Sequence, residues 1–479
     1  MKLENLKPQR VFKYFEEICS IPHGSGDMDK IADYCVEFAK SHALEYKRDG
    51  ANNVVIYKNA TAGYENAEPV ILQGHLDMVC QKLEDRNIDF SADGLDIFID
   101  GDFVKARGTT LGADNGIAVA MVLAILESNE YRHPRIEAVF TTDEEIGMVG
   151  ATKLDMSLLS AKKMINIDSE EEKVVTVSCA GGSDFKVSLP INRVKKSGTE
   201  ATVILKGLKG GHSGIEIDKG RVNANMLAGR FLNSLAKAVD FEIISIDGGD
   251  KGNAIPNLCK MRLCVDDAEK FVNEAEKELE IIKNEISERE KDFSPVITVG
   301  ESAEFDVFDN ELKNNLIFAL LCAPNGIIEM SASIKGLVET SLNLGILTTS
   351  NEEITLLFTL RSNKKSAHIA LENKLNGFSE KLPCTIEASG HYPPWEFKEN
   401  SELQKLYIDT YKEFTGIEPS VEAIHAGLEC GIFYSAIEGL DCISIGPDLF
   451  DVHTVNEKMS ISSTEKIFNV LINLLAKFV

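Results

Sequence analysis

The sequence lacks any long apolar run, although 44% of its 479 residues are hydrophobic. A helix needs about 20 consecutive apolar residues to cross a bilayer, so we expect no membrane span and no membrane partner. The first residues, Met1 to Pro8, contain neither an apolar signal core nor a small-residue cleavage site. We therefore expect a cytoplasmic protein.

Paired cysteines are also missing. The ten cysteines are scattered from Cys19 to Cys442, and none forms a C-x-x-C pair. This spacing argues against a zinc site made of cysteines and, without a secretory signal, against a disulfide framework. Reduced, buried thiols are the expected state.

Positively charged residues are too few to balance the acidic ones. The chain has 50 Lys and Arg residues and 76 Asp and Glu residues, which gives a net charge of −26. Nucleic acids and anionic membranes both need a cationic surface, so neither is an expected partner. Solubility is the simplest role for this acidity, and a smaller part of it could line a metal site.

The chain is too long for one ordinary core, which predicts at least two domains. Its first ~185 residues alternate short apolar runs with helical patterns, as α/β domains do. The same pattern returns near the end of the chain. The predicted strands are 53–56, 70–72, 136–140, 164–167 and 442–445, and the predicted apolar helices are 117–126 and 463–478. Residues 1–186 and 388–479 are therefore expected to form one α/β domain.

The middle of the chain, residues 187–387, has a different pattern of amphipathic helices and paired strands. A long, charge-rich helix is predicted over 269–291, and two strands, 342–347 and 354–360, are joined by a polar turn. The order helix, strand, strand, helix, strand occurs near 221–298 and again near 311–388. We predict an inserted α+β domain that contains an internal duplication.

Residue types that bind metals follow several of the predicted apolar strands. His75, Glu145 and Asp168 each come just after a strand, and His453 lies beyond the strand at 442–445. Ligands in open α/β sheets gather at the carboxyl ends of strands, so these residues could converge. Asp114 precedes an apolar helix, where the plain alternative is a helix N-cap. A single histidine at a strand end is more often structural than a ligand.

Taken together, these five residues suit two divalent cations. Imidazole and carboxylate are zinc ligands, and a pair of metal ions needs a bridging carboxylate, a role that Asp114 could fill. Asp77 is close enough in sequence to hydrogen-bond the other ring nitrogen of His75. Of the adjacent pair Glu144 and Glu145, one could bind metal while the other takes a proton from a nucleophilic water. The pattern indicates a metal-dependent hydrolase.

Seven motifs, spread in order over most of the chain, strengthen this interpretation. They are Leu72–Val79 (LQGHLDMV), Ala106–Gly116 (ARGTTLGADNG), Thr142–Met148 (TDEEIGM), Asn166–Glu171 (NIDSEE), Gly207–Gly214 (GLKGGHSG), Asn253–Pro256 (NAIP) and His425–Gly431 (HAGLECG). With these motifs the sequence resembles the zinc peptidase family that includes carnosinases, aminoacylase, tripeptidase and succinyl-diaminopimelate desuccinylase. The resemblance implies an α/β catalytic domain, with a mixed sheet flanked by helices, and an inserted α+β lid domain.

The resemblance also implies a role for each candidate residue. It assigns His75 and Asp168 to one zinc ion and Glu145 and His453 to the other, with Asp114 as the bridge. It further implies a cis peptide bond after Asp114. The remaining roles that it implies are Glu144 as general base, Asp77 as the orienter of His75, His212 of the lid as oxyanion donor, and Arg361 and Asn253 as substrate contacts.

The expected activity is therefore hydrolysis of dipeptides of broad specificity, including Xaa-His, with two Zn²⁺ per chain that Co²⁺ or Mn²⁺ can replace. The alternatives are a tripeptidase or an N-acyl amino acid hydrolase of the same family, or a peptide-binding protein without activity, which the retained Glu144 disfavours. Relatives are often homodimers, so a homodimer is expected, although a duplicated lid could let one chain complete its own site. After His453 the run Thr454–Glu457 lacks the proline that relatives commonly have.

Overall fold

The computed structural model describes residues 2–478, which divide into two compact units. Unit 1 contains the described residues up to Cys179 together with Trp395–Ala423 and the residues from Leu428 onward. Unit 2 contains Ala180–Pro394 and Ile424–Gly427. Among residues 2–478, no helix is both long and apolar enough to cross a membrane.

Unit 1 is built on an eight-stranded sheet with the strand order β1-β2-β6-β3-β7-β21-β8-β20. The central strands β6, β3, β7 and β21 are parallel to one another, whereas β1, β2 and β8 run antiparallel to their neighbours. The strands are β1 (Glu45–Arg48), β2 (Val54–Lys58), β3 (Val70–His75), β6 (Ile136–Thr141), β7 (Lys163–Asn166), β8 (Val174–Cys179), β20 (Ser420–Ile424) and β21 (Asp441–Ser444). The predicted mixed sheet is confirmed, and β21 from the end of the chain completes its parallel centre.

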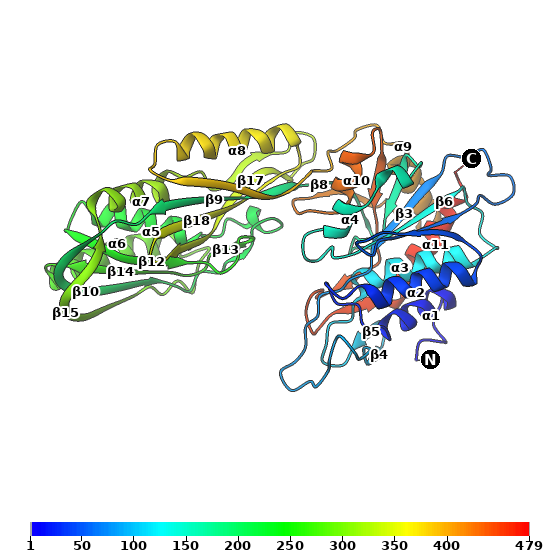
Figure 1. Cartoon of the computed structure of the whole chain (residues 1–479), viewed down its shortest axis with the longest axis horizontal. Coiled ribbons are helices and arrows are strands. Elements are labelled where there is room, and N and C mark those ends of the chain that lie inside the picture. The colour runs from blue at the N-terminus through cyan, green and yellow to red at the C-terminus, as the bar shows by residue number, and fades with distance from the viewer. Residues whose placement is uncertain (1, 479) are drawn as a thin grey trace. The chain divides into compact units, whose positions relative to one another are not determined.

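Helices cover this sheet and explain why its strands are apolar without alternation (Figure 1). One core joins a face of the sheet to α1 (Gln9–Cys19), α2 (Asp29–Ser41), α3 (Ala113–Glu127), α9 (Glu402–Thr415) and α11 (Ile461–Leu475). The shorter helices are α4 (Val149–Lys153), η1 (Met156–Leu158) and α10 (Cys430–Ala436). Strands buried on both faces become continuously hydrophobic, and helix α3, apolar all round, is buried throughout most of its length.

A small four-stranded sheet completes unit 1, in the order β22-β23-β5-β4. Its strands are β4 (Ile97–Asp100), β5 (Phe103–Ala106), β22 (Leu449–Phe450) and β23 (Lys458–Ser460). Strands β22 and β23 flank the loop that carries His453, so this sheet ties that loop to the rest of unit 1.

Unit 2 is an α+β structure whose main sheet has nine strands, in the order β15-β10-β14-β12-β17-β18-β9-β19 with β16 beside β17. The strands are β9 (Gly181–Pro190), β10 (Arg193–Leu205), β12 (Phe241–Gly248), β14 (Cys259–Val265), β15 (Val296–Phe308), β16 (Gly326–Met330), β17 (Val338–Thr349), β18 (Glu353–Ser362) and β19 (Thr385–Tyr392). The helices are η2 (Ile217–Lys219), α5 (Ala224–Leu235), α6 (Ala268–Ile286), α7 (Asn310–Cys322) and α8 (Lys365–Ser379). A separate pair is formed by β11 (Gly211–His212) and β13 (Ala254–Ile255). Unit 2 has its own hydrophobic core.

The repeated element order predicted from the sequence is present in unit 2. The first set is α5-β12-β14-α6-β15 and the second is α7-β17-β18-α8-β19, apart from the short strands β13 and β16. The two sets lie in mirrored order in the sheet and meet where β12 pairs with β17. Strand β10 enters one half and β9 enters the other at the equivalent place.

The helix predicted over 269–291 ends earlier, at Ile286. The predicted helix was too long because the charge of Glu290 indicates an exposed helix face. Glu290 is instead 1% exposed, and its side chain turns inward. The carboxylate of Glu290 accepts hydrogen bonds from the backbone N–H of Lys209 (2.8 Å) and of Val222 (3.0 Å). These contacts fix the chain on both sides of the segment that contains His212.

Candidate metal centre

The parallel strands of unit 1 bring the candidate ligands to one edge of the sheet. His75 is the last residue of β3 and lies opposite Thr141, the last residue of β6. Asp168 follows β7, which is parallel to both β3 and β21. The chain then runs from β6 into Glu144 and Glu145, so the structure brings together the residue types that the sequence placed at strand ends.

The side chains meet in two groups that share Asp114. Oδ1 of Asp114 lies 3.2 Å from Nε2 of His75, which in turn is 3.4 Å from Oδ1 of Asp168. Oδ2 of Asp114 lies 3.0 Å from Nε2 of His453, which is 2.9 Å from Oε1 of Glu145. Ligands that share a zinc ion at about 2.0–2.1 Å are roughly 3–3.5 Å apart, so both groups have the spacing of metal-binding sets.

Asp114 does not act as the N-cap of α3. The cap position is Gly112, no side chain caps it, and Asp114 itself has a non-helical backbone (φ −83°, ψ 103°). The peptide bond between Asp114 and Asn115 is cis, as the resemblance implied. The amide of Asn115 binds the His75 N–H at 3.1 Å and the Ile167 carbonyl at 2.7 Å, which links the ends of β3 and β7.

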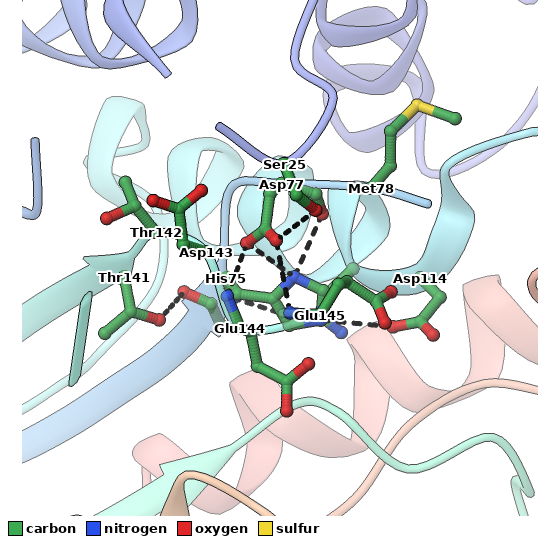
Figure 2. Close-up of polar contacts among 12 residues, drawn as sticks. Ser25, His75, Asp77, Met78, Asp114, Thr141, Thr142, Asp143, Glu144 and Glu145 are labelled. Carbon is green, nitrogen blue, oxygen red and sulfur yellow. Dashed lines mark hydrogen bonds and ion pairs between the residues drawn. The ribbon is translucent and has the colours of Figure 1, made fainter. Parts of the chain in front are cut away.

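Asp77 holds three groups at once (Figure 2). Asp77 is buried, with the residue 1% exposed. Its carboxylate accepts hydrogen bonds from Ser25 Oγ (2.8 Å) and from the backbone N–H of Glu144 (3.0 Å) and of Glu145 (3.2 Å). Nδ1 of His75 lies 3.0 Å from the Asp77 carbonyl oxygen and 3.5 Å from its carboxylate. Asp77 is thus next to the His75 ring as predicted, and it also anchors the Glu144–Glu145 backbone, which the sequence did not indicate.

These contacts leave Nε2 of His75 facing carboxylates while Nδ1 can donate to Asp77. Burial opposes protonation of His75, yet Asp168, Asp114 and Asp77 raise its pKa well above the ordinary value. Hydrogen bonds to Asp114 and Glu145 raise the pKa of His453 to about 11. An environment that favours positive charge so strongly also suits divalent cations, so the residues present fit a two-metal centre.

Glu144 is half-buried beside this cluster. Its neighbour Glu145 has a different direction, because the Glu145 carboxylate faces His453. Burial raises the pKa of Glu144 well above its ordinary value, and the carboxylates of Asp168 and Glu429 add to the rise, while His75 opposes it. A carboxylate with raised proton affinity near a candidate metal centre has the property that a general base needs.

A polar network below the ligands was not predicted. Glu429 accepts hydrogen bonds from Thr141 Oγ1 (2.6 Å) and from the amide of Gln73, and Gln73 accepts one from Asn166 (2.6 Å). Gln73 and Asn166 lie two residues before His75 and Asp168, and Gln73 shares a face of β3 with His75. The available signal was their polarity within otherwise apolar strands, since buried polar residues need partners. Burial raises the pKa of Glu429 to about 7.

His212 belongs to unit 2, where β11 pairs with β13. Its Nδ1 accepts hydrogen bonds from the backbone N–H of Gly214 and of Ile215, each at 3.1 Å. Because Nδ1 is an acceptor, the ring proton of the neutral imidazole must lie on Nε2. Burial and the nearby Arg361 guanidinium lower the pKa of His212 to about 4. His212 is therefore a neutral hydrogen-bond donor through Nε2.

Arg361 and Asn253 are also in unit 2. Arg361 is 6% exposed and donates to the Tyr392 hydroxyl at 3.0 Å, while its buried Nε has no hydrogen-bond partner among residues 2–478. Asn253 is exposed and precedes Ala254, the strand partner of His212. Arg361 is thus near enough to His212 to lower the pKa of that imidazole. Asn253 is next to Ala254, the strand partner of His212.

His425 lies in the same unit and received no role from the sequence, although it begins a quoted motif. Its Nε2 is 2.7 Å from Ser341 Oγ and its Nδ1 is 3.1 Å from Asn363 Oδ1. Burial, with help from Arg361 and His212, lowers the pKa of His425 to about 3. His425 is therefore a neutral imidazole with a hydrogen-bond partner at each ring nitrogen.

Comparisons with known proteins identify the family of the chain. The sequence profile of Peptidase family M20/M25/M40 matches residues 71–477. The chain is similar to the cytosol non-specific dipeptidase of Escherichia coli (strain K12), with 39% identity over 99% of this chain and 98% of that protein. The crystal structure of aminoacylhistidine dipeptidase from Vibrio alginolyticus matches with a TM-score of 0.89 and 38% identity, over 99% of this chain and 98% of that one. Aminopeptidase PepT from Bacillus cereus ATCC 10987 has a related fold, with a TM-score of 0.57 at 13% identity over 99% of both chains.

Proposed function

Because the chain belongs to Peptidase family M20/M25/M40, we propose that it is a metal-dependent dipeptidase of broad specificity whose substrates include Xaa-His. The names of the Escherichia coli and Vibrio alginolyticus relatives, each similar over nearly the full length, support dipeptides as substrates. The observation that carries the proposal is the position of Asp114, whose two oxygens each face a different histidine and carboxylate.

The proposed metal centre holds two Zn²⁺ ions. His75 and Asp168 with one oxygen of Asp114 form the first site, and Glu145 and His453 with the other oxygen form the second. The distances from each histidine to its two carboxylates, 3.2 and 3.4 Å for His75 and 3.0 and 2.9 Å for His453, support this division. Co²⁺ or Mn²⁺ can occupy such ligand sets, so zinc is the proposed native ion and these two are proposed substitutes.

Metal ions in such a centre lower the pKa of a water molecule and polarise the substrate carbonyl. Glu144 takes the proton of the attacking water and later passes it to the leaving amine, which its raised proton affinity supports. Asp77 holds the backbone of Glu144 and keeps His75 oriented. In this reaction the neutral His212 donates its Nε2 proton as a hydrogen bond to the oxyanion of the tetrahedral intermediate.

The remaining residues of unit 2 recognise the substrate in this proposal, and unit 2 acts as the lid. The buried Nε of Arg361 has no partner within the described part of the chain, and its planar guanidinium can bind the terminal carboxylate of a dipeptide. Asn253 adds a polar contact from the segment beside His212. Recognition of a carboxylate one residue beyond the scissile bond would favour dipeptides over longer peptides.

The test is hydrolysis of a panel of dipeptides, tripeptides and N-acyl amino acids by metal-stripped protein, with and without added Zn²⁺. Zinc-restored cleavage of dipeptides, with little action on the other two classes, is expected. Faster cleavage of tripeptides or acylated amino acids would replace the proposal with the corresponding alternative of the same family. Two bound metals without turnover on any substrate would indicate a peptide-binding protein.

We also propose a cytoplasmic homodimer, and the name of the Escherichia coli relative, a cytosol dipeptidase, supports only the location. The repeated halves of unit 2 keep open the alternative that one chain completes its own site. Mixing inactive Glu144→Gln protein with inactive His212→Gln protein distinguishes the two. Recovered activity would mean that His212 serves the partner's site, and light scattering would give the oligomeric state.

A further inference from the structure

Glu457 makes an unusual set of contacts in unit 1. Its side chain is almost fully buried, with the residue 3% exposed, and its two carboxylate oxygens accept hydrogen bonds from consecutive backbone N–H groups. Leu111 donates to Oε2 at 2.7 Å and Gly112 to the same oxygen at 3.1 Å. Ala113 donates to Oε1 at 2.8 Å, with the Asp114 N–H at 3.4 Å. A run of backbone N–H groups around one anion forms a nest.

Both partners in this contact are continuous with candidate metal ligands. The N–H donors end at Asp114, the residue shared by the two metal groups. On the other side, Glu457 lies four residues after His453, in a loop where Asp451 (φ 54°) and His453 (φ 62°) both have left-handed backbone. One buried carboxylate therefore joins the loop that carries Asp114 to the loop that carries His453.

The small sheet holds the ends of the His453 loop, because β23 pairs with β5, but Glu457 makes the contact that reaches the Asp114 segment itself. His453 itself is exposed, with a side chain 47% accessible. By contrast, His75 ends a central strand, and Asn115 hydrogen-bonds both the His75 N–H and the Ile167 carbonyl beside Asp168. The two histidines thus differ in what holds them: His75 ends a central strand, whereas His453 lies in a loop whose contact with the Asp114 segment is made by Glu457.

We propose that Glu457 is a positioning residue that sets the spacing of Asp114 and His453 and thereby the affinity of the second metal site. This inference rests on the proposed division of the metal ligands. A general stabilising role would weaken both metal ions alike, whereas positioning predicts an asymmetric loss. The site made by Asp114, Glu145 and His453 weakens because the His453 loop shifts. The site made by His75, Asp168 and Asp114 keeps its affinity, because Asn115 still holds the Asp114 segment to the ends of β3 and β7.

The experiment is metal titration of the full-length chain carrying Glu457→Gln, which keeps the size of the side chain but removes its charge and one acceptor oxygen. Loss of partners that orient metal ligands costs about 10–100-fold in metal affinity. We expect this loss for one of two Zn²⁺ ions, measured by chelator competition and metal content, and a change in the Co²⁺ visible spectrum of one site. Glu457→Asp, which keeps the charge on a shorter side chain, should weaken the same ion and serves if the Gln variant does not fold.

The matched control is Glu137→Gln. Glu137 is also buried, at 1% exposure, and also accepts backbone N–H groups, from Ser160 (2.9 Å) and Ala161 (3.1 Å), but no candidate ligand lies next to these donors. It should bind both ions with unchanged affinity. Equal weakening of both ions in Glu457→Gln, or the same pattern in Glu137→Gln, would overturn the inference.

His453→Ala separates this inference from the proposed function. If His453→Ala loses one ion while Glu457→Gln and Glu457→Asp retain both at wild-type affinity, the metal assignment stands and the positioning role is wrong. If His453→Ala retains both ions at wild-type affinity, the proposed metal assignment itself fails, and with it the premise of the positioning role.

Discussion

Replacing Asp77 with Asn should loosen the Glu144–Glu145 backbone more than it disturbs His75. The Asp77 carboxylate accepts the N–H groups of both glutamates, and an amide has only one oxygen to offer. The NH₂ group of the introduced Asn would face one of these backbone N–H groups. Because residue 77 is only 1% exposed, no bulk water replaces the lost acceptor. A buried donor left without a partner costs about 1–3 kcal/mol. His75 keeps its contact with the Asp77 backbone carbonyl, at 3.0 Å, because the substitution does not change it.

Two assays follow from this geometry. Hydrogen exchange at the amides of Glu144 and Glu145 should accelerate by about 5–150-fold, the equivalent of 1–3 kcal/mol if local opening limits exchange. Metal affinity should fall by about 10–100-fold, because Glu145 is a proposed ligand and its backbone moves. The matched control is Ser25→Ala, which removes the third partner of Asp77 but leaves both N–H contacts, so its effect on these amides should be smaller.

The pH dependence has a definite sign. Burial opposes ionisation of Asp77, but hydrogen bonds from His75, Glu144 and Ser25 hold its pKa below the ordinary value. Its stabilising contribution is therefore present above the unfolded pKa of about 4 and is lost as pH falls through the lower folded value. Unchanged amide exchange and metal affinity in Asp77→Asn at neutral pH would refute the reasoning.

Three further predictions concern single residues. Glu144→Gln should lower kcat by at least about 100-fold while two metal ions remain bound, and loss of a metal instead would make Glu144 a ligand. His212→Gln should lower kcat by about 10²–10³-fold without changing metal content. Because the pKa of His212 is about 4, protonation of this group should cause no loss of wild-type activity between pH 5 and 7. His425, with a folded pKa of about 3, stays neutral while the unfolded chain takes up a proton below about pH 6.5, so stability should fall by about 2 kcal/mol from pH 7 to pH 5. Chemical denaturation at both pH values checks this, and His425→Gln showing the same pH-dependent loss would contradict it.

Much of the architecture could be predicted from local patterns. Strands β3, β6, β7 and β21 were visible as short apolar runs because burial on both faces removes polar alternation. The change of pattern after residue ~185 revealed an inserted α+β segment. The motifs around His75, Asp114 and His212 predicted the family, which is confirmed by the profile match over residues 71–477. The division of roles among the site residues stays a prediction.

Sequence reasoning was weaker where a side chain acts against its local pattern. The charge of Glu290 suggested a continued helix, whereas its carboxylate is buried against two backbone N–H groups from another segment. Asp114 had two interpretations, cap or ligand, and both place an acid at a helix start; taken alone, its position favoured the cap. Only its non-helical backbone and the direction of its two oxygens separate them.

The sequence by itself determined the elements, the chemistry of the ligand types and the family, because these depend on periodicity, residue type and motif. Tertiary structure alone decided which atoms meet. Leu111 and Glu457 are 346 residues apart, and no local pattern couples them. The proton position on His212 likewise depends on two N–H groups that its own loop turns toward Nδ1. Contacts of this kind are set by how the whole chain packs, since a side chain's partner is chosen by distance in space rather than by position in the chain.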